Sequence, residues 1–193
     1  DNWTLDDAVR CCALLLKESE IETRMAGVLV LGAFRKDFAP ALTDHAYKWL
    51  RTRLDNWALV DSLCSSVLSP LLEKYPEVGA THASPVQVWS RDPCLWVRRA
   101  DLVTLVPLAR HGEYLDLSYE LARDHFGDPE DLMQKAVGWL LREAGKTDAG
   151  RLRRFLLQHG PAIPRTSLRY AIERFSAADR TELMNATRPK RRK

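Results

Sequence analysis

Apolar residues recur along this chain of 193 residues at spacings of three and four, the period of an amphipathic α-helix. No segment shows sustained alternation of apolar and polar residues, so the sequence predicts an all-α protein. Thr4 is the predicted N-cap of the first helix, with Asp7 three residues later. The predicted helices cover residues 6–17, 21–34, 43–54, 56–72, 96–109, 113–125, 131–144, 149–159, 164–174 and 177–184, with a turn-rich connector at 75–85 and a short helical or turn piece at 86–90.

The helix predicted over residues 131–144 carries a tryptophan on the side opposite its apolar stripe. At ~100° per residue, Trp139 falls with Lys135 and Arg142 on the face that points away from the core. Trp139 therefore either fills a second packed layer or is presented to a partner, and the pattern leaves both interpretations open. The apolar stripe consists of Met133, Ala136, Val137, Leu140 and Leu141.

The helix predicted over residues 56–72 combines an aromatic residue with a carboxylate. Trp57 and Asp61 are four residues apart, so they share one face at the edge of the apolar stripe. Aspartate is a poor residue for a helix interior, so the position of Asp61 asks for a reason. One interpretation is a surface aspartate that pairs with a neighbouring arginine, and the other is a functional carboxylate.

The chain shows a degenerate internal repeat. Several predicted helices begin with a cation or a tryptophan, followed by a small residue and an apolar run, and the starts at Arg24, Trp57, Arg99 and Lys135 are 33, 42 and 36 residues apart. Two-helix solenoid repeats such as HEAT have periods of about 40–47 residues or a little less. We therefore predict a right-handed solenoid of antiparallel helix pairs that forms a single domain over residues 1–187, with equivalent helices lining a concave face.

Residues near these helix starts would meet on the concave face. They combine aromatic rings with cations, which suits a ligand that is rich in phosphates and rings. The set comprises Arg24, Trp57, Asp61, Arg98, Arg99, Lys135, Trp139 and Arg142.

The composition is that of an ordinary soluble globular protein, with 46% hydrophobic and 28% charged residues. No apolar run is long enough to span a membrane, and the acidic start D-N-W-T-L-D-D is unlike a secretory signal. The four cysteines form no C-x-x-C pair, and none lies near a histidine at zinc-ligand spacing. We therefore predict no metal, no cofactor, no membrane partner and a reducing intracellular compartment.

The net charge of +3 is unevenly distributed along the chain. Residues 1–97 hold 10 Lys or Arg against 13 Asp or Glu, whereas residues 98–193 hold 19 against 13. Five of the later cations lie in the tail at 188–193, which is either a disordered basic arm or a solvated end without a role. Bulk charge is therefore weak evidence for nucleic-acid binding.

Three sequence blocks resemble the AlkD-like family of HEAT-repeat DNA glycosylases, the DNA alkylation repair proteins. The blocks are N-W-A-L-V-D at 56–61, W-V-R-R-A at 96–100 and Q-K-A-V-G-W-L-L-R-E at 134–143. They occur in the order of the family and at about its spacing. The similarity extends over most of the chain, from about residue 21 to residue 172.

The resemblance implies a monofunctional glycosylase that removes N3- or N7-alkylated purines from double-stranded DNA. By position, Trp57 and Trp139 resemble the two tryptophans that cradle the sugar of the lesion. Asp61 resembles the catalytic carboxylate, and Arg99 resembles the arginine that contacts the DNA backbone opposite it. The residues expected to contact DNA are Arg24, Arg98, Lys135 and Arg142.

These residue types suit the implied chemistry. Cleavage of the C–N bond builds positive charge on the deoxyribose, as in glycoside hydrolysis. A carboxylate stabilises that charge, and each flanking indole face adds about 0.5–2 kcal/mol. An alkylated purine that already carries a positive charge leaves without a general acid, so no second carboxylate is required.

The family usually carries a further helix pair upstream of the part matched here. We therefore expect one end of the concave face to be incomplete and an apolar face to be exposed there. The alternative function is a non-catalytic HEAT-like scaffold that binds DNA or protein through the same face. In either case we expect a monomer that is located in the cytoplasm with the nucleoid, or in the nucleus.

Overall fold

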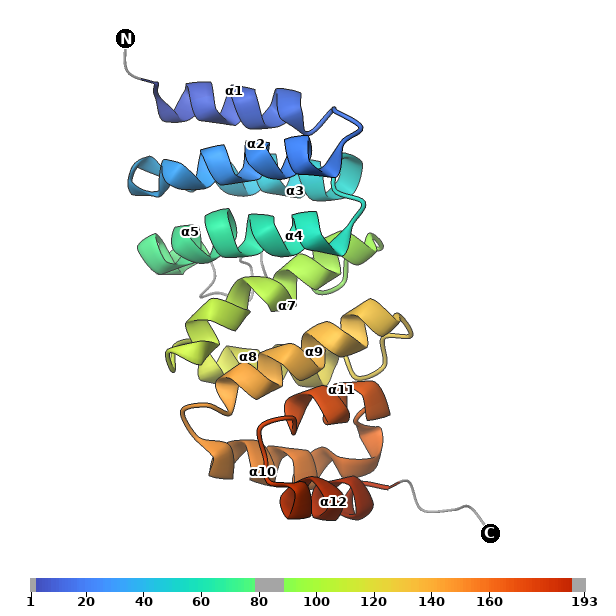
Figure 1. The fold of residues 1–193 in the computed structure, drawn as a ribbon. Helices are drawn as coiled ribbons and strands as arrows, with labels where there is room; N and C mark the ends of the chain where they lie inside the picture. The colour runs from blue at the N-terminus through green and yellow to red at the C-terminus, as the bar shows by residue number, and fades with distance from the viewer. Residues whose placement is uncertain (1–2, 79–88, 189–193) are drawn as a thin grey trace. The chain divides into compact units, whose positions relative to one another are not determined.

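Helices form every regular element in the part of the chain that the computed structural model describes, residues 3–78 and 89–188 (Figure 1). The all-α prediction is therefore confirmed. Among these described helices, none is long and apolar enough to cross a membrane. The chain divides into two compact units, residues 1–104 and 105–193.

The first unit contains the elements from α1 to the first part of α7, and the rest of α7 belongs to the second unit. Its elements are α1 (Leu5–Leu15), α2 (Ile21–Ala33), a 3-10 turn (Arg35–Asp37), α3 (Leu42–Thr52), α4 (Trp57–Leu63), a π-helical turn (Cys64–Leu68), α5 (Ser69–Lys74), a second 3-10 turn (Pro76–Val78) and the start of α7 (Leu95–Arg110). The second unit contains α8 (Leu115–Asp124), α9 (Asp131–Ala144), α10 (Ala149–His159), a 3-10 turn (Gly160–Ala162), α11 (Arg165–Ala171) and α12 (Ala177–Ala186).

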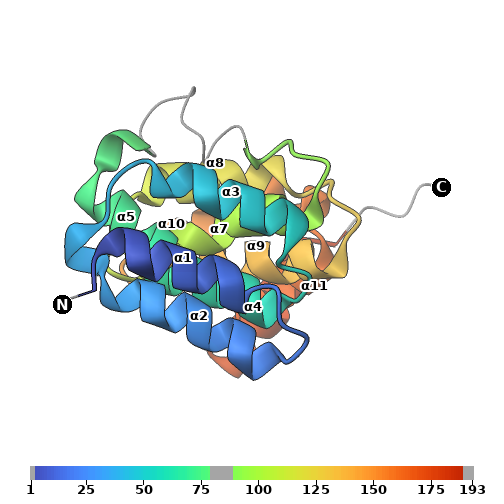
Figure 2. The same cartoon turned by 90° about the horizontal axis from the view of Figure 1, so that it is seen from above.

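In the first unit, α2 packs closely on both of its neighbours (Figure 2). A Cβ atom on Gly27 would lie 3.0 Å from the Cβ of Leu15 on α1. On the other side, a Cβ on Gly32 would lie 3.0 Å from the Cβ of Ser66 in the π-helical turn. Larger side chains at these glycines would push the helices apart, so the two glycines allow α1, α2 and α4 to stack in succession.

The segment from α4 to α5 is one helical rod, where the sequence predicts a single helix over residues 56–72. The difference is the π-helical turn in its middle, which changes the angular position of the side chains that follow. The hydroxyl of Ser69 donates to the carbonyl oxygen of Thr104 at 2.7 Å and ties the rod to α7. The apolar stripe of the rod is fully buried and consists of Leu59, Val60, Leu63, Cys64 and Val67.

In the second unit, α9 and α11 approach each other closely at a glycine of the third sequence block. A Cβ on Gly138 would lie 2.5 Å from the carbonyl oxygen of Ser167 and would overlap the Cβ of Tyr170. The hydroxyl of Ser167 also donates to the carbonyl oxygen of Gln134 at 2.8 Å. The backbone of α11 therefore lies directly against α9 at Gly138, the residue before Trp139.

Most helix boundaries fall within a few residues of the predicted ones. Thr4 caps α1 as predicted, because its side chain accepts from the N–H of Asp7, and the Asp7 carboxylate accepts from the N–H of Thr4 at 2.9 Å. α11 ends at Ala171 instead of continuing to residue 174, because a tight turn follows in which the N–H of Phe175 donates to Ile172. The predicted connector at 75–85 and short piece at 86–90 lie mostly outside the described residues.

An apolar face of α2 is exposed in the first unit. Ile21 and Leu29 are 37% and 55% exposed. Together with Met25 they line a shallow depression on the surface of the helix. The first unit therefore has apolar side chains on the solvent-facing side of α2.

Candidate functional site

The first turn of α4 positions Trp57 and Asp61. The side chain of Asn56 accepts a hydrogen bond from the N–H of Ala58 at 2.8 Å, so the helix begins at Trp57. Trp57 is 53% exposed, which is high for a large aromatic side chain, and Asp61 one turn later is partly exposed. The two residues lie beside the buried stripe as predicted, so an indole and a carboxylate share one helix face.

Arg99 on α7 holds the carboxylate of Asp61 in a two-pronged ion pair. Its Nε donates to Oδ1 at 2.9 Å and its Nη2 donates to Oδ2 at 2.8 Å. The Arg99 and Asp61 side chains are only 6% and 14% exposed, so the pair is largely shielded from water. Asp61 thus pairs with an arginine, as one of the two sequence interpretations held, but the pair is partly buried and the plane of the carboxylate is fixed.

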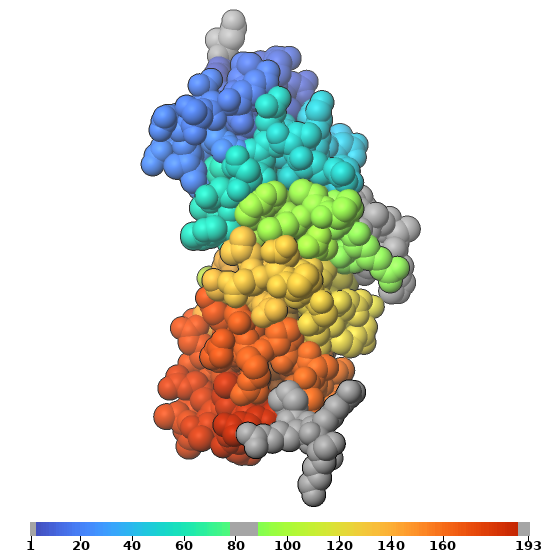
Figure 3. Space-filling view, turned by 90° about the vertical axis from the view of Figure 1, so that its right-hand side faces the viewer, coloured from blue at the N-terminus to red at the C-terminus, as the bar shows by residue number. Residues whose placement is uncertain are grey.

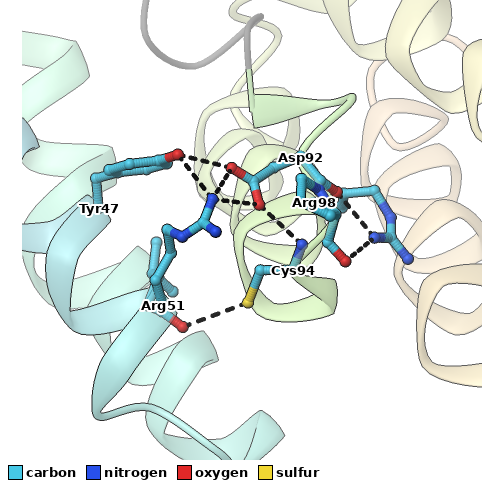
Figure 4. Close-up of polar contacts among 7 residues, drawn as sticks. Tyr47, Arg51, Asp92, Cys94 and Arg98 are labelled. Atoms are coloured by element: carbon cyan, nitrogen blue, oxygen red, sulfur yellow. Dashed lines mark hydrogen bonds and ion pairs between the residues drawn. The ribbon is translucent and has the colours of Figure 1, made fainter.

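A polar network fixes the turn in which α7 begins (Figure 4). The Asp92 carboxylate accepts hydrogen bonds from the Tyr47 hydroxyl at 2.8 Å and from the Arg51 guanidinium at 3.0 Å, both on α3. It also accepts from the N–H of Cys94 at 2.8 Å. Burial alone would raise the pKa of Asp92, but these hydrogen bonds and the charge of Arg51 outweigh burial and lower the pKa. The turn is therefore held to α3 by a charged carboxylate.

Arg98, a predicted DNA contact, takes part in the same turn. Its Nη1 donates to the carbonyl oxygens of Asp92 at 2.9 Å and Pro93 at 3.0 Å (Figure 4). Arg98 directly precedes Arg99 in the chain. The interactions that fix the start of α7 therefore also set the position of the arginine that holds Asp61.

Arg24, a second predicted DNA contact, links α2 to the turn before α4. Its Nη1 pairs with Oδ1 of Asp55 at 2.9 Å, and its Nη2 donates to the carbonyl oxygen of Arg53. The Arg24 side chain is 11% exposed. Its observed contacts brace the turn that leads to Trp57.

The helix α9 keeps the predicted division into two faces. Its five apolar stripe residues are fully buried, whereas Lys135, Trp139 and Arg142 are partly exposed. Both cations already have carboxylate partners in the second unit. The pairs are Lys135 with Asp131 at 2.7 Å, Arg142 with Glu143 at 3.3 Å, and Arg142 with Glu173.

Glu143 is a buried acid whose role the sequence pattern did not reveal. It is 1% exposed, its Oε2 accepts from Nε of Arg110 at 2.9 Å, and it also pairs with Lys146 and Arg142. Burial alone would raise the pKa of Glu143, but hydrogen bonds from Lys146 and Arg110 lower it. The available signal was its place at the edge of the apolar stripe, next to Arg142.

The fold and the site define a class of protein: an all-helical protein that presents an exposed indole and an arginine-held carboxylate on one helix face. In the part of the chain that the structure describes, no group of three or more His, Cys, Asp or Glu side chains could hold a metal ion. The chain belongs to the DNA alkylation repair enzyme family, whose model matches residues 1–175. The matched range includes every predicted site residue, and membership supports a role in the repair of alkylation damage.

A solved structure supports the same fold. The chain is similar to a predicted DNA alkylation repair enzyme from Enterococcus faecalis, with a TM-score of 0.78 and 14% sequence identity. The match covers 91% of this chain and 78% of the other. A likeness at this low identity shows a shared fold. Comparison with curated proteins found no match.

Proposed function

We propose that this protein is a monofunctional DNA glycosylase that hydrolyses the N-glycosidic bond of N3- or N7-alkylated purines in duplex DNA. The observation that carries the proposal is the arrangement of Trp57, Asp61 and Arg99. An exposed indole stands one helical turn before a carboxylate that a buried arginine holds in a fixed plane. Membership of the DNA alkylation repair enzyme family supports DNA with alkylation damage as the substrate.

The proposed reaction breaks the bond between C1′ of the deoxyribose and the nitrogen of the base. A cationic alkylated purine takes the bonding electrons and departs as a neutral base, which leaves an oxocarbenium-like sugar. Water adds to C1′, and its proton passes to Asp61 or to solvent. Asp61 opposes the developing positive charge, and the Trp57 indole face stabilises the same charge by a cation–π interaction.

The pair with Arg99 is compatible with this role for Asp61. A carboxylate offers about four acceptor positions, and the two hydrogen bonds from Arg99 use two of them. The others are available to a water molecule or to the sugar. The role expected for Arg99 from the sequence, contact with the DNA backbone, requires a phosphate to reach a side chain that is 6% exposed. We therefore assign Arg99 first to positioning Asp61.

The second unit is proposed to complete the site. Trp139, partly exposed on α9, would form the other wall around the sugar, opposite Trp57. Arg24, Arg98, Lys135 and Arg142 keep their proposed roles in DNA contact, for which each would add a phosphate to the partners it already has. A continuous right-handed solenoid over residues 1–187, acting as a monomer, is the arrangement in which these helices would share one concave face.

The test is release of free base from methylated duplex DNA. Wild-type protein is expected to release 7-methylguanine and 3-methyladenine, and Asp61→Asn is expected to lose most of this release because a neutral amide cannot oppose the charge on the sugar. The matched control is Asp44→Asn, the same change at an exposed position in the first turn of α3, which should keep wild-type release.

Two results would redirect the proposal. Duplex binding by the wild type without base release would support the non-catalytic scaffold in place of the enzyme. Base release that Asp61→Asn leaves unchanged would remove Asp61 from the reaction.

A further inference from the structure

The helices α11 and α12 form the C-terminal end of the second unit, which is drawn in orange and red in Figure 3. Three arginines of this region lie on α11 or just after the end of α12. Arg165 and Arg169 are one turn apart on α11, so they share a helix face. Arg188 follows the end of α12. Arg169 and Arg188 are exposed, and Arg165 is partly exposed. We call these three residues the arginine cluster.

Direct contacts place Arg165 against the end of α12. Its Nη1 donates to the hydroxyl of Thr187 at 3.1 Å, and its Nη2 donates to the carbonyl oxygen of Met184 at 2.9 Å. Arg188 is the next residue after Thr187. The fold therefore brings Arg165 against residues that lie 19 and 22 positions later in the sequence, just before Arg188.

The acidic side chains of this region form ion pairs with arginines outside the cluster. Residues 165–188 contain three acids, Glu173, Asp179 and Glu182. Glu173 pairs with Arg142 of α9, and both Asp179 and Glu182 pair with Arg153 of α10. Within the described residues, no carboxylate forms an ion pair with any member of the arginine cluster.

The arginines earlier in the second unit differ in this respect. Six of them, from α7 to α10, have a carboxylate partner: Arg110, Arg123, Arg142, Arg151, Arg153 and Arg154. Like charges brought together without an acid repel each other, and this repulsion acts on Arg165. Burial lowers the pKa of Arg165, and the charges of Arg188 and Arg169 lower it further.

We propose that the arginine cluster binds phosphates of the duplex DNA backbone, as a contact separate from Trp57 and Asp61. Guanidinium groups present planar pairs of N–H donors that match phosphate oxygens, and the successive phosphates of a bound backbone would relieve the repulsion among the three charges. This inference rests on the proposed function and extends it by naming a backbone contact on α11 and α12. None of the three residues belongs to the sequence blocks that carry the family resemblance.

The test measures binding of the full chain to a short unmodified duplex over a series of salt concentrations. Each phosphate contact contributes about 0.9 to the slope of log K against log salt. The double variant Arg169→Gln with Arg188→Gln should therefore reduce the slope by about 1.8. Arg165 is left in place because it also anchors α12.

A matched control removes the same charge at two other exposed sites. Arg123 and Arg154 are 50% and 73% exposed and face carboxylates, so Arg123→Gln with Arg154→Gln should leave the slope close to that of the wild type. Arg169→Lys with Arg188→Lys retains both charges and should restore the slope. Because inorganic phosphate lacks the spaced charges of a backbone, we expect no saturable phosphate binding by calorimetry.

Two results for the salt slope would contradict DNA binding by the arginine cluster: equal slopes for the wild type and the cluster variant, or equal reductions of the slope in the cluster and control variants. Absence of duplex binding by the wild type would also contradict it, as would saturable phosphate binding together with an unchanged slope for DNA. Because the duplex is unmodified, this test is independent of base release. A protein that excises no bases can still show the predicted salt slopes, and an active glycosylase can lack the predicted difference between variants.

Discussion

At the scale of single residues, the central feature is a carboxylate held by a guanidinium on a neighbouring helix. Asp61 and Arg99 are 38 residues apart and share two nearly equal hydrogen bonds. Fixing a carboxylate before the substrate arrives removes the cost of orienting it during the reaction. Trp57, in contrast, is 53% exposed and offers its ring to solvent.

Replacing Trp57 by alanine should slow base release by about 2- to 30-fold, which corresponds to the loss of one cation–π contact of about 0.5–2 kcal/mol. Single-turnover release of 7-methylguanine measures this effect. Trp3 is a matched control, because it is 57% exposed, close to the 53% of Trp57. Equal losses in Trp57→Ala and Trp3→Ala would remove the specific role of Trp57.

Replacing Arg99 by alanine should lower the free energy of unfolding by about 3 kcal/mol, because Asp61 would remain partly buried without its partner. The double variant with Asp61→Asn should lose less than the sum of the two single variants, by about 1 kcal/mol or more. Urea unfolding of the four proteins measures the coupling. Additive losses would mean that the pair contributes nothing as a pair.

The sequence predicted which side of each helix the site residues occupy but not which residues they meet. The helical period places Trp57 and Asp61 beside the apolar stripe of their helix, and Trp139 opposite the stripe of its own, from local spacing alone. The pairing of Asp61 with Arg99 depends on how α4 packs against α7, which local spacing does not contain. Asp92 was missed as an anchor for the same reason, since its partners lie on α3.

At the scale of elements, close helix contacts depend on small residues at defined positions. Gly138 is the clearest case, because any Cβ there would overlap the backbone of α11. The same residue precedes Trp139, so the contact that joins α9 to α11 also determines where the indole emerges.

Replacing Gly138 by alanine should destabilise the protein, although alanine is the better helix former by about 1 kcal/mol. Overpacking costs about 1–3 kcal/mol, and a rigid backbone contact places this site near the upper end. Thermal unfolding measures the change. Gly127→Ala is the control, since a Cβ there meets nothing within 4 Å. If Gly138→Ala were as stable as the wild type or more stable, α11 would have to move aside for the added methyl group at little cost in free energy.

Helix positions were predictable where apolar period and end signals agree. The ranges predicted for α9 and α10 coincide with the observed Asp131–Ala144 and Ala149–His159. The π-helical turn at residues 64–68 was not predictable, because the buried apolar residues before and after it keep α-helical spacing in the sequence. α11 was predicted too long because its apolar pattern continues through Ile172 into the turn.

At the scale of the whole molecule, stability should depend on two partly or fully buried carboxylates. Asp92 and Glu143 have pKa values below their ordinary 3.8 and 4.5, because ion pairs and hydrogen bonds outweigh burial. Such groups contribute stability that is fully present above the ordinary pKa and is lost as the pH falls through the lowered one. The free energy of unfolding should therefore decrease as the pH falls below 4.5.

Glu143→Gln should flatten this decrease and should also cost stability at neutral pH, because Arg110 and Lys146 lose their shared partner. Urea unfolding at a series of pH values measures both effects. Glu18→Gln, at an exposed position after α1, should retain the acid dependence of the wild type. A steep acid dependence that survives in Glu143→Gln would assign it to other carboxylates.

The proposed glycosylase removes bases whose own positive charge makes them leaving groups. The most direct measurement compares one duplex that carries 7-methylguanine with the same duplex carrying uncharged O6-methylguanine, each incubated with excess protein. We predict release of free 7-methylguanine and no release of O6-methylguanine, because the proposed mechanism has no general acid for a neutral leaving group. Release of neither base, or of both at similar rates, would contradict the account.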